Sequence, residues 1–465
     1  MKRKGFYASD SQTYRYKGHY KGLPLQILNE SRDQRPQSLL QKQLQLRLCE
    51  ACSKYQLVPA MLACGSFDSW SKHRLETTKC HVVHKGGGGD HFTSTIFFIN
   101  LELKFEHQTP KVYHMLLKIS PEDPIYRKYI DADILFHNET LMYNEVIPSF
   151  KELLKKRQAV SLGQIFPKCY YAKCGAGDTD IVVLENMAPR GFRPSADKLS
   201  LDYDHCAIAL SHLARYHAIS YAMKKLEPSA FHAMVKKSRA QNYANSSPED
   251  MTYFLKKTSY RGVRYVEARQ ELDQATLDRL KDRLEVAGQL FSDLMAPKEP
   301  LAVMCHGDFC RNNILFRYDS GKPCDAILFD FQNVKYGSPV IDLSLLMYLN
   351  MSSELRAQHW DDLFGEYHVA LTGTLAEILG CSVEELLPDF GLEEFRKEFV
   401  GHCLYGYLIC SFFLPQMLVE QKDQVDHEIL FKSLSQMADI IINYGEPAPK
   451  KLADILKHLA PMGAI

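Results

Sequence analysis

One segment, from a Cys-His-Gly-Asp sequence to an Asp-Phe-Gln triplet, limits the possible folds more than any other part of the chain. Within it, Asp308 is followed five residues later by Asn313 and seventeen residues after that by Asp330. Residues 314–318 and 326–331 have the apolar, β-rich composition of strands, separated by a turn sequence that contains Gly and Pro. The pattern predicts a hairpin that brings Asn313 and Asp330 to the same end.

These three polar residues are the types that phosphoryl transfer to a hydroxyl requires. The carboxylate of Asp308 can accept the proton of the attacking hydroxyl. The amide oxygen of Asn313 and the carboxylate of Asp330 are hard ligands that suit Mg²⁺, the ion that neutralises a nucleoside triphosphate. Turns and helix caps use the same residue types. Turn chemistry does not demand all three at this spacing, so the pattern favours the catalytic interpretation.

The same motifs resemble those of the insect ecdysteroid kinase-like family, also called the CHK kinase-like family, within the superfamily of choline and aminoglycoside kinases. The resemblance spans residues 85–445 and includes Asp-Phe-Gln at 330–332 in place of Asp-Phe-Gly. It implies an α+β, two-lobed protein-kinase-like fold with an antiparallel sheet in the N-lobe and a larger helical C-lobe. We expect a flexible basic arm at 1–35, an N-lobe at 36–185, and a C-lobe with the acceptor pocket at 186–465.

Four consecutive glycines before a β-rich run predict a phosphate-binding loop. Glycine lets backbone amides approach phosphates without obstruction by side chains. By similarity to a Gly-Asp-Asn-Tyr-x-Ser pattern of the family, we expect Gly88, Gly89 and Ser94 to bind the nucleotide. His91 stands where the family usually has Asn. A flexible linker is the alternative interpretation of such a glycine run.

A lysine and a glutamate are expected to position the phosphates. Residues 111–119 predict a strand with Lys118 near its end, and a buried ammonium there needs an anionic partner. The candidate is Glu139, on a helix expected to begin near Ala132. Their order and spacing match the family's strand lysine and helix glutamate. The alternative is a solvated position, which is usual for an isolated Lys or Glu.

Residues 181–187 predict a buried strand that runs into polar residues. The segment resembles the family's Leu-Glu-Asp-Leu hinge, whose backbone binds adenine, so we expect Glu185 and Met187 to contact the nucleotide. Asn186 replaces the usual Asp.

Two further residues are expected to support the catalytic loop. His217 lies on a helix expected at 205–224, and a buried, hydrogen-bonded role is more typical of a lone helical histidine than catalysis or metal binding. Asp342 resembles a family aspartate that braces the loop. It follows Gln332 by only ten residues, whereas a regulated protein kinase needs a longer activation segment.

Charge and hydropathy exclude several classes. The 56 Lys and Arg residues balance 56 Asp and Glu residues, so net charge gives no reason to expect nucleic acid as a partner. The longest apolar run, at 403–414, is too short to cross a bilayer, and no apolar leader is recognisable. We therefore expect a cytoplasmic protein without a membrane span. The 13 cysteines, in unrelated contexts, predict free thiols.

Together these features predict an ATP- and Mg²⁺-dependent kinase that phosphorylates a hydroxyl of a lipophilic alcohol, such as an ecdysteroid-like steroid or a glycoside. Basic residues after the hinge and aromatic residues of the late helices favour a neutral acceptor over a polycation, whose ammonium groups need carboxylates. These residues are Lys236, Lys237, Arg239, Lys256, Lys257, Arg261 and Arg264, and Tyr405, Tyr407, Phe412, Phe413 and Met417. A catalytically silent pseudokinase that binds a nucleotide or steroid, and a choline- or aminoglycoside-type kinase, stay open as alternatives.

Overall fold

The computed structural model describes residues 12–15, 24–28, 57–67, 74–85, 94–175, 180–241, 247–418, 433–443 and 447–465. The chain forms two compact units. The first comprises Met1–Pro121 and Pro167–Pro189, and the second comprises Glu122–Phe166 and Arg190–Ile465. Gly88, Gly89 and most of the predicted arm at 1–35 lie outside the described residues. The lobe limits at 36–185 and 186–465 stay a prediction.

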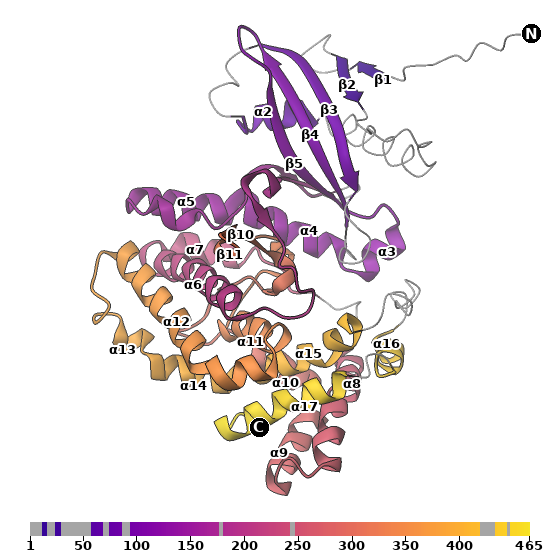
Figure 1. The fold of residues 1–465 in the computed structure, drawn as a ribbon, viewed down its shortest axis with the longest axis vertical. Coiled ribbons are helices and arrows are strands. Elements are labelled where there is room, and N and C mark those ends of the chain that lie inside the picture. Colours follow the sequence, from indigo (N-terminus) through magenta and orange to yellow (C-terminus); the bar gives the residue numbers. More distant parts are fainter. Residues whose placement is uncertain are drawn as a thin grey trace, which may run out of the picture. The chain divides into compact units, whose positions relative to one another are not determined.

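The first unit is built on a seven-stranded sheet in the order β1-β2-β3-β4-β5-β7-β6. Its long strands β3, β4 and β5 lie side by side in Figure 1. Its elements are β1 (Gln12–Arg15), β2 (Pro24–Leu28), α2 (Leu57–Ala63), β3 (Leu75–Lys85), β4 (Thr95–Phe105), β5 (Lys111–Ile119), β6 (Cys169–Lys173) and β7 (Ile181–Glu185), followed by the turn η4 (Ala188–Arg190). All neighbouring strands are antiparallel except β2 and β3. Successive side chains of a strand point to opposite faces, so Phe97, Ile99 and Leu101 of β4 share one face and form part of a buried core with Met115 and Leu117 of β5.

The second unit is mainly helical, with the long helices α6 (Tyr203–Leu226) and α12 (Ser353–Leu379) packed along each other (Figure 1). Its other helical segments are α3 (Pro124–Tyr129), α4 (Ala132–Leu141), η2 (Met142–Val146), α5 (Ile147–Lys156), η3 (Val160–Gly163), α7 (Pro228–Val235), α8 (Pro248–Ala268), α9 (Gln274–Glu285), α10 (Ala287–Met295), η5 (Arg311–Asn313), η6 (Phe331–Asn333), α11 (Val340–Leu349), α13 (Leu387–Phe390), α14 (Leu392–His402), α15 (Leu404–Met417), α16 (Leu434–Ile441), α17 (Ala448–Leu459) and η9 (Ala460–Met462). Two small antiparallel sheets carry the candidate site: β8 (Phe192–Arg193) with β10 (Ile314–Asp319) and β11 (Lys322–Leu328), and β9 (Val303–Cys305) with β12 (Lys335–Gly337).

The antiparallel sheet and the mainly helical remainder confirm the predicted α+β class. β5 has the predicted limits, and α4 begins at Ala132 as expected. The predicted hairpin is also present as β10 and β11, but β11 ends at Leu328 rather than at residue 331. The reason is Asp330, whose φ of 66° is left-handed and cannot continue a strand.

Two predictions about the composition can be compared with the structure. Within the described ranges, no helix is long and apolar enough to cross a membrane. The longest apolar run lies mostly in α15, whose Leu404, Tyr407 and Leu408 are buried core residues instead. The cysteines that the structure describes are all free thiols, as predicted.

Candidate active site

The predicted catalytic loop connects β9 to β10 in the second unit. Nδ2 of Asn313 donates hydrogen bonds to the backbone carbonyl of Asp308, at 2.8 Å, and to Oδ2 of the same residue, at 3.0 Å. A carboxylate only accepts hydrogen bonds, so the amide nitrogen must face it. Oδ1 of Asn313 therefore points away from Asp308, and no described residue donates to it. The loop thus fixes one carboxylate and exposes one amide oxygen as a possible ligand.

The hairpin brings Asp330 to the same end as Asn313. The amide of Phe329 donates to the backbone carbonyl of Asn313 at 3.3 Å, which holds the two chain segments together next to Asp330. Burial raises the pKa of the Asp308 carboxyl, and the negative charge of nearby Asp330 raises it further. Two carboxylates in such proximity favour a cation in their neighbourhood.

The chemistry of Asn313 and Asp330 would fit Mg²⁺, with these two residues as candidate protein ligands. Both offer hard oxygen atoms, and Mg²⁺ is usually held by one or two carboxylates together with substrate phosphates. Across the described part of the chain, no cluster of three or more His, Cys, Asp or Glu side chains could hold a metal by itself. A magnesium site here would consequently depend on oxygen atoms from the triphosphate.

Asp342 braces the start of the catalytic loop, as predicted. Its Oδ2 accepts from the backbone amide of His306 at 2.7 Å, and its Oδ1 accepts from the amide of Gly307 at 2.8 Å. Nε2 of His217 lies 3.1 Å from Oδ2, and Nδ1 of the same ring lies 2.8 Å from the hydroxyl of Tyr367. Since the carboxylate can only accept, Nε2 carries the proton, and Nδ1 of a neutral ring accepts from Tyr367. Asp342 and His217 are both fully buried, so α6 and α11 together fix the loop.

Gly307 can only be a glycine at its position. Its φ is 82°, in the left-handed region, and a Cβ there would lie 1.8 Å from the carbonyl oxygen of Asn333. The catalytic loop therefore passes in direct contact with the turn that follows Asp330. Nε2 of His306 adds a hydrogen bond to the carbonyl of Phe329 at 2.9 Å.

The turn after Asp330 is anchored by residues that sequence reasoning missed. Phe331 is fully buried, with its ring centroid 4.5 Å from that of His306. Nδ2 of Asn138, on α4, donates to the carbonyl of Gln332 at 3.2 Å and to that of Arg239 at 2.8 Å. Its Oδ1 accepts from the amide of Arg239 at 2.9 Å. The position of Asn138 beside Glu139 was the only signal in the sequence, and it does not reveal partners about 100 residues or more away.

Lys118 and Glu139 are both buried, with 4% and 1% of their surface exposed. Lys118 belongs to β5 in the first unit and Glu139 to α4 in the second. Their pairing stays a prediction.

In the predicted hinge, one backbone amide donates no hydrogen bond to a described residue. The amides of Glu185 and Asn186 donate to the carbonyls of Lys168, at 2.8 Å, and His114, at 2.9 Å. Met187 is buried, and its amide donates to no described residue. Buried amides without a partner are rare, so a ligand acceptor at Met187 is consistent with the predicted adenine contact. Ser94 is half-buried directly before β4.

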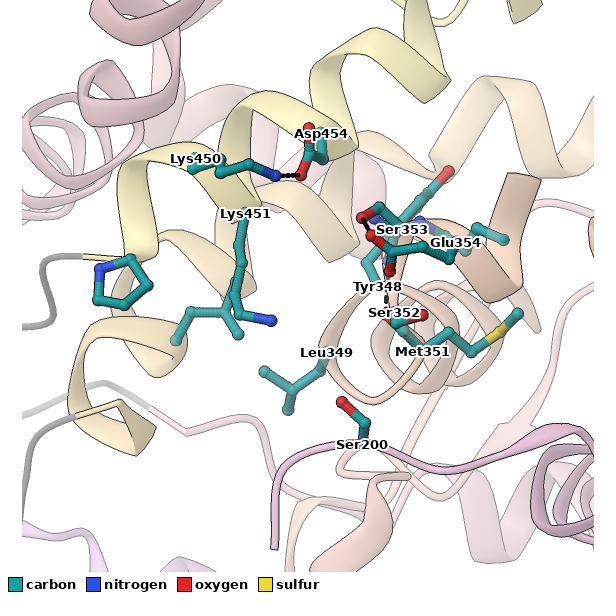
Figure 2. A pocket seen from close by; sticks show the side chains of 13 residues that line it. Ser200, Tyr348, Leu349, Met351, Ser352, Ser353, Glu354, Lys450, Lys451 and Asp454 are labelled. Carbon is teal, nitrogen blue, oxygen red and sulfur yellow. Dashed lines mark hydrogen bonds and ion pairs between the residues drawn. The ribbon is translucent and has the colours of Figure 1, made fainter. Parts of the chain in front are cut away.

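A cavity of about 160 Å³ lies where α12 and α17 begin (Figure 2). Lys450 and Asp454 on its wall form an ion pair with a distance of 3.0 Å, and Lys451 points toward Leu349 (Figure 2). None of the predicted catalytic residues lines it. In the sequence, Asn350 lies between the lining residues Leu349 and Met351. Its Oδ1 accepts from the amide of Arg311 in the catalytic loop at 2.9 Å, so a residue that holds this loop is adjacent in sequence to the cavity lining.

Several residues of the expected acceptor surface contact other parts of the second unit. Three of its basic residues are neutralised in ion pairs: Lys237 with Glu145, Lys256 with Glu285, and Lys257 with Asp439. The aromatic residues are partly core, because Tyr405 stacks on Phe291 and the hydroxyl of Tyr407 donates to the carbonyl of Ser259. The preference for a neutral acceptor stays a prediction.

Comparison with known proteins identifies relatives of this chain. A model of the ecdysteroid kinase-like family matches residues 88–380. No match was found among curated proteins. Among solved structures, an ethanolamine kinase from Plasmodium vivax is 14% identical, with a TM-score of 0.39, and the match covers 94% of this chain and all of that one. A putative aminoglycoside phosphotransferase from Ralstonia eutropha is 12% identical, with a TM-score of 0.36, and the match covers 87% of this chain and 98% of that one.

Proposed function

This chain belongs to the ecdysteroid kinase-like family, and from that premise we propose that it is an ATP-dependent kinase for a small alcohol. The acceptor that we propose is a lipophilic alcohol, such as an ecdysteroid-like steroid or a glycoside, in keeping with the family. One observation carries the proposal. Nδ2 of Asn313 is bonded to Asp308, which leaves its amide oxygen available on the hairpin end that bears Asp330.

The reaction assigns one task to each group. The acceptor oxygen attacks the γ-phosphorus of ATP, and the bond from that phosphorus to the β,γ-bridging oxygen breaks. ADP leaves with the electron pair, and the proton of the acceptor hydroxyl passes to the carboxylate of Asp308. The products are a phosphate monoester and ADP. Asp342 keeps the loop backbone fixed while Asp308 receives the proton.

The remaining predicted residues would hold the nucleotide. Asn313 and Asp330 would bind Mg²⁺, which neutralises charge on the phosphates. Lys118 would contact the phosphates and Glu139 would position Lys118. The backbone at Glu185 and Met187 would bind adenine, and Gly88, Gly89 and Ser94 would contact the phosphates. The amide of Met187, which donates to none of the described residues, supports this assignment.

An acceptor screen tests the proposal. Purified protein is incubated with MgATP and, separately, steroid alcohols, aryl glycosides, choline, ethanolamine and kanamycin, with ATP consumption and product mass measured. We expect a phosphate monoester from at least one steroid or glycoside, and none from the Asp308→Asn variant. Preference for kanamycin or an amino alcohol would contradict the proposed acceptor class. Binding of MgATP with no product from any acceptor would favour the catalytically silent alternative.

A further inference from the structure

Lys335 is a cation beside the catalytic loop that has no assigned task. It begins β12 and lies opposite Cys305 of β9. Its Cε would be 3.1 Å from a Cβ placed on Gly307, so the side chain runs along the loop backbone next to Asp308. Burial raises the pKa of Asp308 most strongly, and the positive charge of Lys335 is among the groups that oppose this rise. The ammonium is thus electrostatically coupled to the proposed base.

Among the residues that the structure describes, none offers an oxygen atom as a hydrogen-bond partner to the ammonium of Lys335. Its Nζ lies 3.8 Å from Sδ of Met295, and no carboxylate of a described residue is within ion-pair distance. Lys224, in the same region, shows the usual arrangement. Its Nζ donates to Glu299 at 2.8 Å and to the carbonyls of Pro300 and Ala302 at 2.9 and 2.6 Å.

This half-buried ammonium has a thioether contact and no oxygen partner among the described residues, so an incoming anion could pair with it without breaking an existing ion pair. Thioether sulfur is a weak acceptor and cannot balance the charge. An anion delivered by a ligand would supply both an oxygen acceptor and a balancing negative charge. In the proposed reaction, the only anionic group that must come next to Asp308 is the phosphoryl group in transfer.

We propose that Lys335 is a catalytic residue whose ammonium binds the phosphoryl group while it passes from ATP to the acceptor. This inference rests on the proposed function. The transition state spreads negative charge over three equatorial oxygens, and a cation already in place stabilises that charge without reorganisation. Lys335 takes no part in proton transfer, because the hydroxyl proton goes to Asp308.

Kinetics of three variants test this role. Lys335→Met removes the charge at nearly constant length, and Lys335→Arg keeps it. Lys322→Met is the control. Lys322 begins β11, its side chain is 80% exposed, and its Nζ lies 3.7 Å from Oδ2 of Asp204 on α6. With an alcohol identified in the screen, we expect Lys335→Met to lower kcat by about 10²–10³-fold, the usual effect of removing one transition-state donor. MgATP affinity should stay within about threefold of wild type, because the ammonium acts on the transition state rather than on bound ATP.

The other two substitutions should have little effect on phosphotransfer. Lys335→Arg should retain most activity and Lys322→Met all of it. If wild type transfers phosphate and Lys335→Met transfers it equally fast, the inference about Lys335 is wrong while the proposed function stands.

A second measurement needs no acceptor. Wild-type protein is acetylated with trace acetic anhydride alone, with MgADP, and with MgADP plus aluminium fluoride, which mimics the phosphoryl group in transfer. Mass spectrometry then gives the labelling of each lysine. We expect strong protection of Lys335 in the fluoroaluminate complex only, and equal labelling of Lys322 in all three. Equal labelling of Lys335 in all three samples would overturn the inference. Protection of Lys335 combined with failure of every acceptor would instead contradict the proposed acceptor class alone.

Discussion

Replacing Asp342 by Asn should loosen the catalytic loop and destabilise the second unit. Oδ2 accepts from His306 and His217, and Oδ1 accepts from Gly307, all in a fully buried environment. An amide has one oxygen, so it can serve one side only, and its NH₂ group must then face a backbone amide that also donates.

The size of the loss follows from those contacts. One buried donor without a partner costs about 1–3 kcal/mol, and the facing NH₂ group adds a second donor in the same position. With two facing donors left unsatisfied, we expect Asp342→Asn to lower the free energy of unfolding by about 3 kcal/mol.

Asp325→Asn is a matched control. Asp325 also faces a histidine of α6, with Nε2 of His212 at 3.0 Å, but its side chain is 29% exposed. Water can replace the lost contact there, so the expected loss is below about 1 kcal/mol. Urea titration followed by circular dichroism measures both variants, and phosphotransfer by folded Asp342→Asn should be slower than wild type. Equal destabilisation by the two substitutions would refute the bracing role.

Three further predictions concern the metal ligand, the loop glycine and a half-buried histidine. Asp330→Ala should abolish the magnesium dependence of ATP binding in calorimetry, whereas Asp308→Asn should leave binding nearly unchanged and lower kcat by about 10²–10⁴-fold; equal losses of affinity would contradict the two roles. Gly307→Ala should destabilise the protein by about 2–4 kcal/mol, because its Cβ would lie 1.8 Å from a backbone oxygen, and urea titration should show only about 1 kcal/mol for Gly321→Ala, which has a φ of 85° but open space around it. Burial lowers the pKa of His458 to about 4, so the folded state holds a neutral ring, full stability is present above about pH 6.5, and it falls as the pH drops toward 4. After allowance for partial exposure we expect about 1–2 kcal/mol of loss, absent from His458→Gln, and identical pH dependence of the two proteins in urea titrations would disprove it.

The sequence was sufficient for the local parts of the site. The spacing of Asp308, Asn313 and Asp330 around one hairpin is a property of adjacent segments, so alternation and turn residues predicted it. The bracing pair of His217 and Asp342 was also anticipated, through resemblance and the usual behaviour of a buried histidine.

Long-range contacts of ordinary polar residues could not be predicted in this way. Asn138 and Asn350 each bond backbone groups far away in sequence, and an Asn on a helix or at its end has no local pattern that names its partners. The ion pairs of the basic residues after the hinge were unpredictable for the same reason. The carboxylates that neutralise Lys237 and Lys257 come from distant helices.

The single amide of Asn138 has a consequence for how the second unit opens. This amide forms hydrogen bonds with the backbone of Arg239 and with the backbone of Gln332. One side chain therefore connects α4, the segment before residue 242 and the turn after Asp330. We expect segments connected by the same side chain to open together. Hydrogen exchange at the Arg239 amide would then report the opening of the turn at Gln332. The exchange rate of an amide 93 residues before Gln332 in the sequence would then measure how often the proposed metal-binding turn opens.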